Sequence, residues 1–349
     1  MRMLAIAVLV LSVFAGSARA QSDGALVARF DRAYADGAYE RAATVATTLA
    51  ERHESSSVWA FNAACAHARA GNLDDARRWV TACAERGFQG VRSFETDQDL
   101  DPIRGSQEFA EAFALVQAAA RARLEEFQQA ARVHAHPSWV PEHASTDSPV
   151  PLVIALHGTG GRGDEMLRVW KEACAEVGAA IIAPDGLRPS GEGYAWTYRD
   201  ESEWLVRDLI ERVAAGMPVD TTRVVLTGFS QGANVAMPTG IDHAGLFVGV
   251  IPVGGHYEGQ IVDLEPVRSG AIVPPRYGFI IGSRDRWAGT FRAAEREFEE
   301  AGVEVKLEVV PGMGHEMPRG RGGTARLARM LAWCLGEGDE GPGDEPGDG

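Results

Sequence analysis

A single serine between two glycines, in Gly228-Phe229-Ser230-Gln231-Gly232, is the residue of this sequence with the clearest chemical potential. An apolar run ends at Gly228, and small helix-forming residues follow the serine. Two glycines permit a tight turn from strand to helix, which presents the hydroxyl beside a helix N-terminus in a strained backbone conformation. This G-x-S-x-G pattern predicts that Ser230 is a nucleophile. A plain glycine-rich loop is the alternative interpretation, because the motif alone is only moderately specific.

Two later segments supply the groups that would activate a serine, whose hydroxyl is a weak nucleophile without a base. His315 lies just beyond an apolar run, between Gly314 and Glu316, and its imidazole can accept and return a proton. Asp285 follows another apolar run and would fix the imidazole tautomer and stabilise the imidazolium. Asp263 is the alternative acid, although it follows a less apolar run.

A glycine-rich turn at residues 157–161 follows an early apolar run and would supply backbone N–H donors. We predict an oxyanion hole formed by the amides of Thr159 and Gln231, each worth about 3–4 kcal/mol in the transition state. His157 is interpreted as a structural histidine that supports this loop. The segment is not a phosphate-binding P-loop, because the lysine and the Ser/Thr of that motif are missing.

Short apolar runs alternate with helical patterns from Pro151 onward. Such alternation predicts a mostly parallel sheet, buried on both faces and covered by helices. Ligands of such sheets bind beyond the carboxyl ends of the strands, where the residues described above lie. An edge strand is expected at residues 138–140. The six apolar runs are 151–158, 179–186, 223–230, 248–255, 277–283 and 305–312, and the helical patterns include 164–178, 203–216 and 290–302.

The preceding region, residues 21–130, is rich in Ala, Arg and Glu and is expected to be all-α. The segment Gly37–Ala42 (GAYERA) is echoed 34 residues later by Gly71–Ala76 (GNLDDA). A 34-residue period with Gly, a bulky residue two positions on and Ala five positions on is the tetratricopeptide pattern. A plain helical bundle with a chance echo is the alternative, since two echoes are fewer than a free-standing solenoid needs.

Residues from about 148 to 334 resemble serine esterases of the α/β-hydrolase superfamily. The resemblance rests on LHGTGG, VDTTRVVLTGFSQGANVAM, IIGSRDRW and VPGMGHEMP, and on the chain order Ser230, Asp285, His315. It is greatest to phospholipase/carboxylesterase-type enzymes, with feruloyl esterases and polyhydroxybutyrate depolymerases nearby. It implies an α/β-hydrolase fold and hydrolysis of carboxylic esters without metal or organic cofactor. The compact domain leaves little room for a large lid, so we expect soluble or short-chain esters.

The aromatic segment 189–204 lies between a predicted strand and the next helix, on the side of the predicted site. Its aromatic side chains could form a wall for the acyl or alcohol group, and Trp196 is the residue we expect to touch substrate. Trp287, two residues after Asp285, is expected to border the site as well. Packing against the sheet is the alternative role, above all for Trp204, which begins an amphipathic helix. The other two aromatic residues of this segment are Tyr194 and Tyr198.

The two ends of the chain differ in composition from the rest. A charged start, a short apolar run and Ala18-Arg19-Ala20 predict a secretory signal peptide at residues 1–20, cleaved before Gln21, and hence a periplasmic or extracellular protein. An uncleaved N-terminal anchor is the alternative. The hydrolase domain is expected at residues 131–336. The acidic Gly/Pro segment 337–349 is expected to be a disordered tail.

Charge and cysteine usage limit the partners. The net charge of −15 and the lack of a basic patch exclude nucleic acid as an expected partner. No apolar stretch beyond the signal region is long enough to cross a membrane.

The four cysteines include no C-x-x-C pair, so no metal site is expected. A disulfide between Cys65 and Cys83 is disfavoured because the two lie at different heights on neighbouring predicted helices. A disulfide between Cys174 and Cys334 stays open.

Three functions are compatible with the sequence. The leading one is an exported serine esterase that acts on a small-molecule or polymer-linked ester through an acyl-enzyme. The second is a serine peptidase of the same fold, which would use the same residues. The third is a non-catalytic binding or scaffold protein, because helical repeats present concave surfaces to protein partners.

Overall fold

The computed structural model describes residues 18–214, 216–259 and 261–337 and divides into two compact units, which meet in sequence between Glu126 and Phe127. This division lies inside one helix, α6 (Gln107–Val133), a few residues before the domain boundary predicted from the sequence. Most of the predicted signal peptide and acidic tail falls outside the described residues. Among the described residues, no helix is long and apolar enough to span a bilayer.

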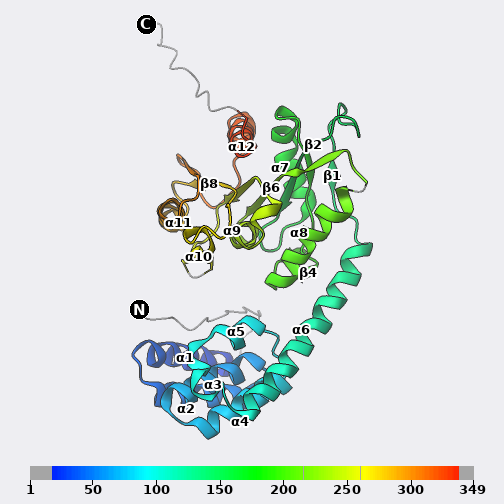
Figure 1. The fold of residues 1–349 in the computed structure, drawn as a ribbon. Coiled ribbons are helices and arrows are strands. Elements are labelled where there is room, and N and C mark those ends of the chain that lie inside the picture. The colour runs from blue at the N-terminus through cyan, green and yellow to red at the C-terminus, as the bar shows by residue number, and fades with distance from the viewer. Residues whose placement is uncertain (1–17, 215, 260, 338–349) are drawn as a thin grey trace. The chain divides into compact units, whose positions relative to one another are not determined.

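The first unit is all-α, as expected (Figure 1). The echoed motifs begin two of its helices in the same way. Gly37 and Gly71 both have a positive φ, 69° and 83°, which glycine adopts without steric cost. Ala42 and Ala76, five positions on, are fully buried where neighbouring helices pack. Its elements are α1 (Ala18–Ala35), α2 (Tyr39–Arg52), α3 (Ser57–Ala70), α4 (Leu73–Glu85), α5 (Val91–Thr96), the 3₁₀ helix η1 (Gln98–Ile103) and the start of α6.

An aromatic cluster closes the core of this helical unit. Phe94 of α5 is completely buried, with ring centroids 5.5–6.0 Å from those of four other phenylalanines. Offset and tilted ring pairs of this kind stabilise a fold more than the burial of their apolar area alone would. The short α5 is therefore held by packing, because six residues are too few to form a stable helix alone. The four partners are Phe61, Phe88, Phe109 and Phe113.

The second unit is built on a seven-stranded sheet with the order β1-β3-β2-β6-β7-β8-β9. Every pairing in it is parallel except that of the edge strand β1 with β3, which confirms the mostly parallel sheet. The strands are β1 (Ser138–Trp139), β2 (Val150–Leu156), β3 (Ala180–Ile182), β6 (Val219–Phe229), β7 (Gly249–Val253), β8 (Arg276–Gly282) and β9 (Val305–Val310).

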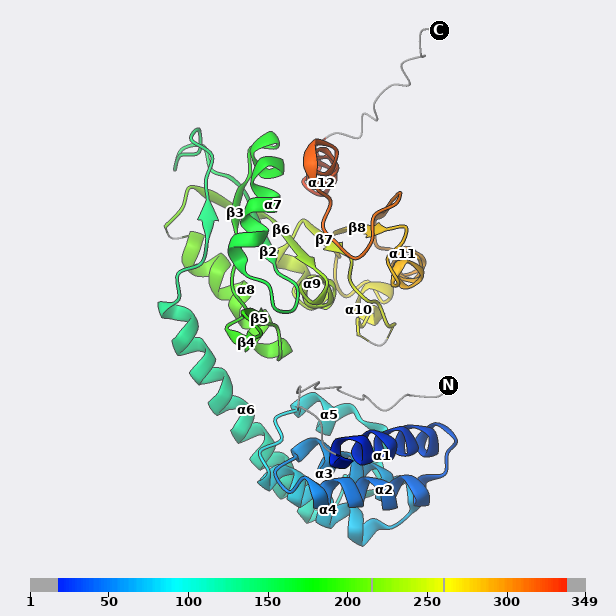
Figure 2. The ribbon, with the colours of Figure 1, turned by 180° about the vertical axis from the view of Figure 1, so that it is seen from behind.

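Helices cover both faces of this sheet (Figures 1 and 2). Alternate residues of β2 point to opposite sides, so Val153 packs with Trp170 and Leu331 on one face, while Ile154 belongs to the core on the other. The first face is covered by α7 (Gly163–Glu176) and α12 (Gly320–Cys334). The second is covered by α8 (Arg199–Ala214), α9 (Gln231–Asp242) and α11 (Ala288–Ala301), with the short α10 (Glu265–Arg268) beside them.

Several features were not expected from the sequence. A small hairpin, β4 (Arg188–Ser190) with β5 (Gly193–Ala195), occupies the aromatic segment that was read as a loop. Glu337, the first residue of the predicted tail, donates its backbone N–H to the carbonyl of Ala332 and so extends the end of α12. The question that the sequence left open for Cys174 and Cys334 is settled as well, because all four cysteines are free and buried.

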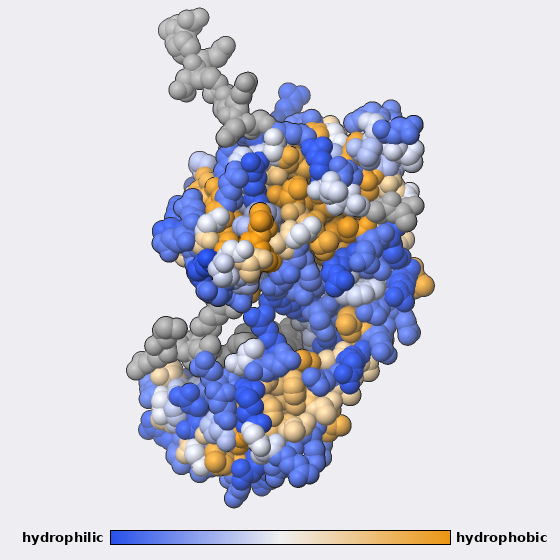
Figure 3. All heavy atoms as spheres, viewed as in Figure 1, coloured by the Kyte–Doolittle hydropathy of each residue, from blue (hydrophilic) through white to orange (hydrophobic). Residues whose placement is uncertain are grey.

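The surface of the described residues is largely hydrophilic. In the view of Figure 3, blue hydrophilic residues cover most of the described face of each unit, and orange hydrophobic residues gather in smaller areas. Only three large hydrophobic side chains among the described residues are strongly exposed: Leu115, Val133 and Val273. They are far apart in the sequence, and each is a single exposed side chain of a kind that surfaces commonly carry.

We predict that Phe94→Ala destabilises the helical unit by about 3–5 kcal/mol, because it leaves a cavity among four aromatic rings. Urea unfolding followed by far-ultraviolet circular dichroism measures the change. Leu115→Ala is the matched control: its side chain is half exposed, so the free energy of unfolding should change by less than about 0.5 kcal/mol. Equal effects of the two substitutions would contradict the packing described here.

Candidate active site

Ser230 lies on a sharp turn between β6 and α9, as the motif predicted. Its φ of 52° and ψ of −113° put it in a region that residues other than glycine rarely adopt. Both flanking glycines are needed for the turn. A Cβ atom on Gly228 would lie 2.2 Å from the carbonyl oxygen of Gly232, and one on Gly232 would lie 2.4 Å from that of Leu156. The turn therefore brings β6, α9 and the end of β2 into direct backbone contact.

Three side chains from separate strand ends form one hydrogen-bonded chain. The Nε2 atom of His315 is 3.0 Å from the Ser230 hydroxyl, and its Nδ1 atom is 2.8 Å from Oδ2 of Asp285. Because a carboxylate only accepts, the neutral imidazole carries its proton on Nδ1 and offers the Nε2 lone pair to the serine hydroxyl. This arrangement can take the proton from the hydroxyl as its oxygen attacks an electrophile.

Asp285 is held firmly, whereas His315 stays accessible. The carboxylate is 1% exposed, and its Oδ1 atom accepts the backbone N–H of Trp287 at 3.0 Å. The His315 side chain is 37% exposed, so a small molecule can reach it from solvent. Asp263, the alternative acid, is an exposed residue whose carboxylate accepts the N–H of Glu265 at the start of α10. The geometry thus favours Asp285.

The loops that carry Asp285 and His315 are joined by their backbones. A Cβ atom on Gly282, at the end of β8, would lie 2.1 Å from the carbonyl oxygen of Met313. The same carbonyl accepts the N–H of Arg284 at 3.0 Å, and the hydroxyl of Ser283 accepts the N–H of Gly312 at 2.9 Å. Only glycine at position 282 permits this approach, which fixes the distance between acid and base.

The two predicted oxyanion donors belong to segments that meet at the Ser230 turn. Gly158, next to Thr159, is so close to the turn that a Cβ there would be 3.3 Å from Cβ of Ser230. Gln231 is the first residue of α9, where backbone N–H groups have no partner within the helix. Within the described part of the chain, neither the Thr159 nor the Gln231 amide donates to a protein acceptor. Both are available to bind an anionic oxygen.

His157 is a buried structural residue, as expected. It is 1% exposed; its Nε2 atom accepts the N–H of Gly186 at 3.0 Å, and its Nδ1 atom donates to the carbonyl of Gly158 at 2.7 Å. Burial lowers the pKa of His157 below its ordinary value, only partly offset by the bond to Gly158. The neutral ring is therefore the form that shapes the 157–161 loop.

Trp196 supports this loop from beneath. Its side chain is buried, and its indole Nε1–H donates to the carbonyl of His157 at 2.8 Å. Its backbone N–H donates to Oε1 of Gln231 at 3.0 Å, and its carbonyl accepts Nε2 of the same side chain at 3.1 Å. One residue thus links the 157–161 loop to the N-terminus of α9. The open aromatic wall expected at Trp196 is not seen, and the structure gives this side chain a supporting position.

The hairpin strand β5 continues the same support. The carbonyl of Tyr194 accepts the N–H of Gly160 at 2.8 Å, and its N–H donates to the carbonyl of Gly161 at 3.0 Å. A Cβ atom on Gly193 would lie 2.3 Å from the carbonyl oxygen of Gly160. This role of the hairpin was not predicted from the sequence, although Gly193 was a signal for close backbone approach.

The other predicted aromatic residues lie in different places. Trp287 is half-buried beside Asp285, and its ring centroid is 3.9 Å from that of His256, which follows the end of β7. Trp204 packs edge-on against Phe127 of α6, in the core role that was the alternative for it. The ring of Tyr198 lies under the guanidinium of Arg188. Of the set, Trp287 is the aromatic residue that the structure places next to the hydrogen-bonded chain.

Comparison with known proteins gives two kinds of similarity, although no family model matches the chain. A Nocardia uniformis subsp. tsuyamanensis protein described as "Putative esterase NocK" is 27% identical over 144 residues, which are 36% of this chain and 40% of that protein. The chain thus matches less than half the length of this curated relative.

Similar solved structures include esterase PE8, with 20% identity and a TM-score of 0.47 over 57% of this chain and 98% of that one. An esterase of the archaeon Pyrobaculum calidifontis has 14% identity and a TM-score of 0.46 over 62% and 93%. The S-formylglutathione hydrolase FrmB of Staphylococcus aureus has 16% identity and a TM-score of 0.43 over 58% and 96%.

The fold class rests on the chain's own topology. A mostly parallel sheet covered by helices on both faces, with a strained serine turn at the end of a central strand, defines an α/β-hydrolase fold. The expected fold class is confirmed, including the helical region that precedes the hydrolase unit.

The buried neutral His157 predicts a pH-dependent stability. A histidine whose pKa is lowered in the folded state is protonated more readily in the unfolded state, so stability falls as pH drops below the ordinary value of 6.5. His157→Gln keeps an acceptor and a donor but removes the titration. At pH 7 we expect the free energy of unfolding of the variant to be about 1–3 kcal/mol lower than that of the wild type. Between pH 7 and pH 5 this free energy should fall less for the variant than for the wild type. Urea unfolding at both pH values measures this, and parallel pH profiles would refute it.

Proposed function

We propose that this protein is a serine hydrolase that cleaves carboxylic esters, with Ser230 as nucleophile, His315 as general base and acid, and Asp285 as the orienting acid. One observation carries the proposal: a strained serine on a strand-to-helix turn is joined to histidine and aspartate by hydrogen bonds of 3.0 and 2.8 Å. The esterase description of the Nocardia relative supports the same reaction class.

The first half of the reaction forms an acyl-enzyme. The Ser230 oxygen attacks the ester carbonyl carbon while its proton passes to Nε2 of His315, and the carbonyl oxygen becomes an oxyanion. The amides of Thr159 and Gln231 donate to this oxyanion. The bond to the alkoxy group then breaks, and the alcohol leaves with the proton from Nε2.

The second half returns the enzyme to its starting state. Water enters where the alcohol stood, gives a proton to Nε2 of His315 and attacks the acyl carbon. The second tetrahedral intermediate collapses to a carboxylic acid, and Ser230 regains its proton from the imidazolium. Asp285 stabilises the imidazolium in both halves, because its buried carboxylate faces Nδ1.

The substrate is proposed to be a small or accessible ester. His315 is partly exposed, so no deep burial separates the reacting atoms from solvent. Trp287, half-buried against His256, is the proposed contact for the acyl or alcohol group. A peptide bond is the alternative substrate, since the same residues can perform acyl transfer from an amide.

The location of the protein is proposed to be outside the cytoplasm. The proposal rests on the charged start, short apolar run and small-residue site of residues 1–20. N-terminal sequencing of the protein recovered from its native cells is the test. A mature chain that begins at Gln21 agrees with export, and one that keeps the apolar run contradicts cleavage.

We predict that Ser230→Ala lowers turnover of p-nitrophenyl acetate and butyrate by at least about 10⁴-fold, because the nucleophile is lost while the fold is kept. Ser269→Ala, on the exposed end of α10, is the matched control and should leave the rate unchanged. A peptide p-nitroanilide assayed in parallel separates esterase from peptidase. Wild-type turnover by the Ser230 variant would refute the assignment.

Asp285→Asn tests the choice of acid. We expect kcat for the same esters to fall by about 10⁴-fold, because an amide facing Nδ1 favours the wrong imidazole tautomer. Asp263→Asn makes the same change at the alternative acid, which is exposed and caps α10, and kcat should stay near the wild-type value. The reverse pattern would assign the acid to Asp263 and contradict the geometry.

A further inference from the structure

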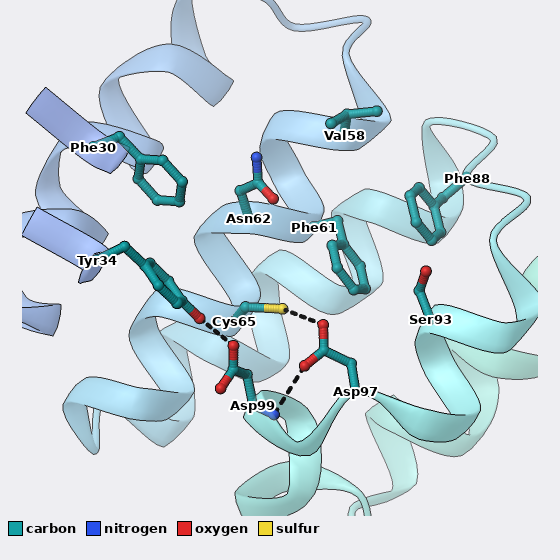
Figure 4. Close-up of a pocket in the computed structure, with 10 residues that line it drawn as sticks. All are labelled: Phe30, Tyr34, Val58, Phe61, Asn62, Cys65, Phe88, Ser93, Asp97 and Asp99. Atoms are coloured by element: carbon teal, nitrogen blue, oxygen red, sulfur yellow. Dashed lines mark hydrogen bonds between the residues drawn. The ribbon is translucent and has the colours of Figure 1, made fainter. Parts of the chain in front are cut away.

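The helical unit contains a small pocket that the proposed hydrolysis does not use. It lies between α1, α3 and the segment that runs from Phe88 to η1 (Figure 4). Its volume of about 60 Å³ is several times the roughly 10–15 Å³ that a cavity needs to hold one water molecule. Several of its residues, including Asn62 and Ser93, are half-buried, so it is reachable from solvent. A pocket of this kind can admit the head group of a side chain from solvent.

Aromatic rings form two sides of the pocket. Phe30 and Tyr34 of α1 lie on one side, with ring centroids 5.3 Å apart. Phe61 of α3 and Phe88 lie on the other, stacked at 4.7 Å with an angle of 7° between their planes. The faces of such rings carry partial negative charge and attract cations.

Two carboxylates close the pocket at one end, and they differ in how their charge is balanced (Figure 4). Asp99 accepts the hydroxyl of Tyr34 and forms an ion pair of 3.0 Å with Arg69. Asp97 caps η1 by accepting the N–H of Asp99 at 3.0 Å, and the thiol of Cys65 lies 3.9 Å from its second oxygen.

Asp97 differs from Asp99 in that no positively charged group is paired directly with its side chain in the described part of the chain. Among the described residues, no lysine, arginine or histidine forms an ion pair with its side chain; the nearby Arg104 instead donates to its backbone carbonyl and pairs with Asp101. Burial raises the pKa of Asp97, and the hydrogen bond from the Asp99 N–H and the charge of Arg104 offset this only in part. Of the two carboxylates that line the pocket, Asp99 is paired with Arg69, whereas Asp97 has no paired cation on its side chain and can receive a positive group.

The remaining polar groups make a metal ion a poor occupant, although Cys65, Asp97 and Asp99 have suitable spacing. Burial is the main cause that raises the pKa of the Cys65 thiol and of the Tyr34 hydroxyl far above their usual values. In the structure the Cys65 thiol lies 3.9 Å from Asp97 and the Tyr34 hydroxyl donates to Asp99, so a metal ion would have to displace these donors and release the thiol proton.

We propose that this pocket binds the guanidinium group of an arginine side chain presented by a polypeptide partner. A planar, weakly hydrated cation stacks on aromatic faces and hydrogen-bonds to carboxylates at the same time, which a compact, strongly hydrated ammonium does less well. The pocket supplies both kinds of surface, and the charge of Asp97 complements the ligand. The proposal concerns the helical unit alone and does not depend on hydrolysis.

Calorimetric titration of the full chain with acetyl-Gly-Arg-Gly-amide tests the proposal, with the citrulline peptide as the neutral isostere. We expect the arginine peptide to bind at least about tenfold more tightly than the citrulline peptide, and more tightly than the lysine peptide. Asp97→Asn should remove this preference, because asparagine still caps η1 but carries no charge. Asp101→Asn removes the same charge from an exposed residue that does not line the pocket, and it should bind as the wild type does.

The opposite results are equally clear. Equal binding of the arginine and citrulline peptides, no binding of either at millimolar concentration, or an unchanged preference in Asp97→Asn would overturn the proposal. A lysine peptide that binds as tightly as the arginine peptide would overturn the assignment to guanidinium. Zinc chloride is titrated in parallel: binding of Zn²⁺ that Asp97→Asn abolishes, without binding of the arginine peptide, would make the pocket a metal site instead. Circular dichroism of each variant shows that the helices are retained.

Discussion

The close approach of three backbones around Ser230 is the constraint on which the hydrolase unit depends. Gly228 and Gly232 let β6, α9 and the end of β2 meet at distances that any side chain would prevent, and Ser230 between them takes a positive φ. Strain of this kind costs about 1–3 kcal/mol and persists only where surrounding contacts over-determine it. Here those contacts come from the sheet, in which every strand except the edge strand β1 directs its carboxyl end to one edge. Asp285 and His315 follow β8 and β9 at that same edge, so the sheet brings together residues far apart in the sequence.

The same residues hold both segments that carry the predicted oxyanion donors, the 157–161 loop and the start of α9. Trp196 holds the 157–161 loop through its indole and the start of α9 through its backbone, and Tyr194 extends the same support. Neutral His157 completes it from within the core. Preorganised donors of this kind act on charge only as it develops, so their value lies in being held still before the reaction. The hairpin gives no side chain to the proposed reaction, but its backbone helps to hold the loop that carries one of the proposed oxyanion donors.

Much of this could be predicted from the sequence, because the signals were local. The G-x-S-x-G pattern located Ser230, and apolar runs that end in Gly or Pro located the strands. The sequence favoured Asp285 over Asp263 because the run before Asp285 is more apolar, but only the fold shows that Asp285 faces His315. The role of Trp196 was predicted wrongly, because the sequence pattern is the same whether an aromatic ring lines a site or packs beneath it. The pocket of the helical unit is lined by residues between Phe30 and Asp99 that are distant in the sequence. A local sequence pattern cannot predict that such residues meet.

The central claim is that the fold makes the hydroxyl of Ser230 uniquely reactive. Fluorophosphonates phosphonylate an activated serine oxygen and leave ordinary serines unmodified, so the claim can be tested without knowing the natural substrate. The native chain would be treated with such a probe, digested and analysed by peptide mass spectrometry, beside a sample unfolded in urea before treatment. The account predicts one stoichiometric adduct, on Ser230, that forms in the native sample and not in the unfolded one. An unmodified Ser230 in the folded protein, or an adduct on a different serine, would contradict it.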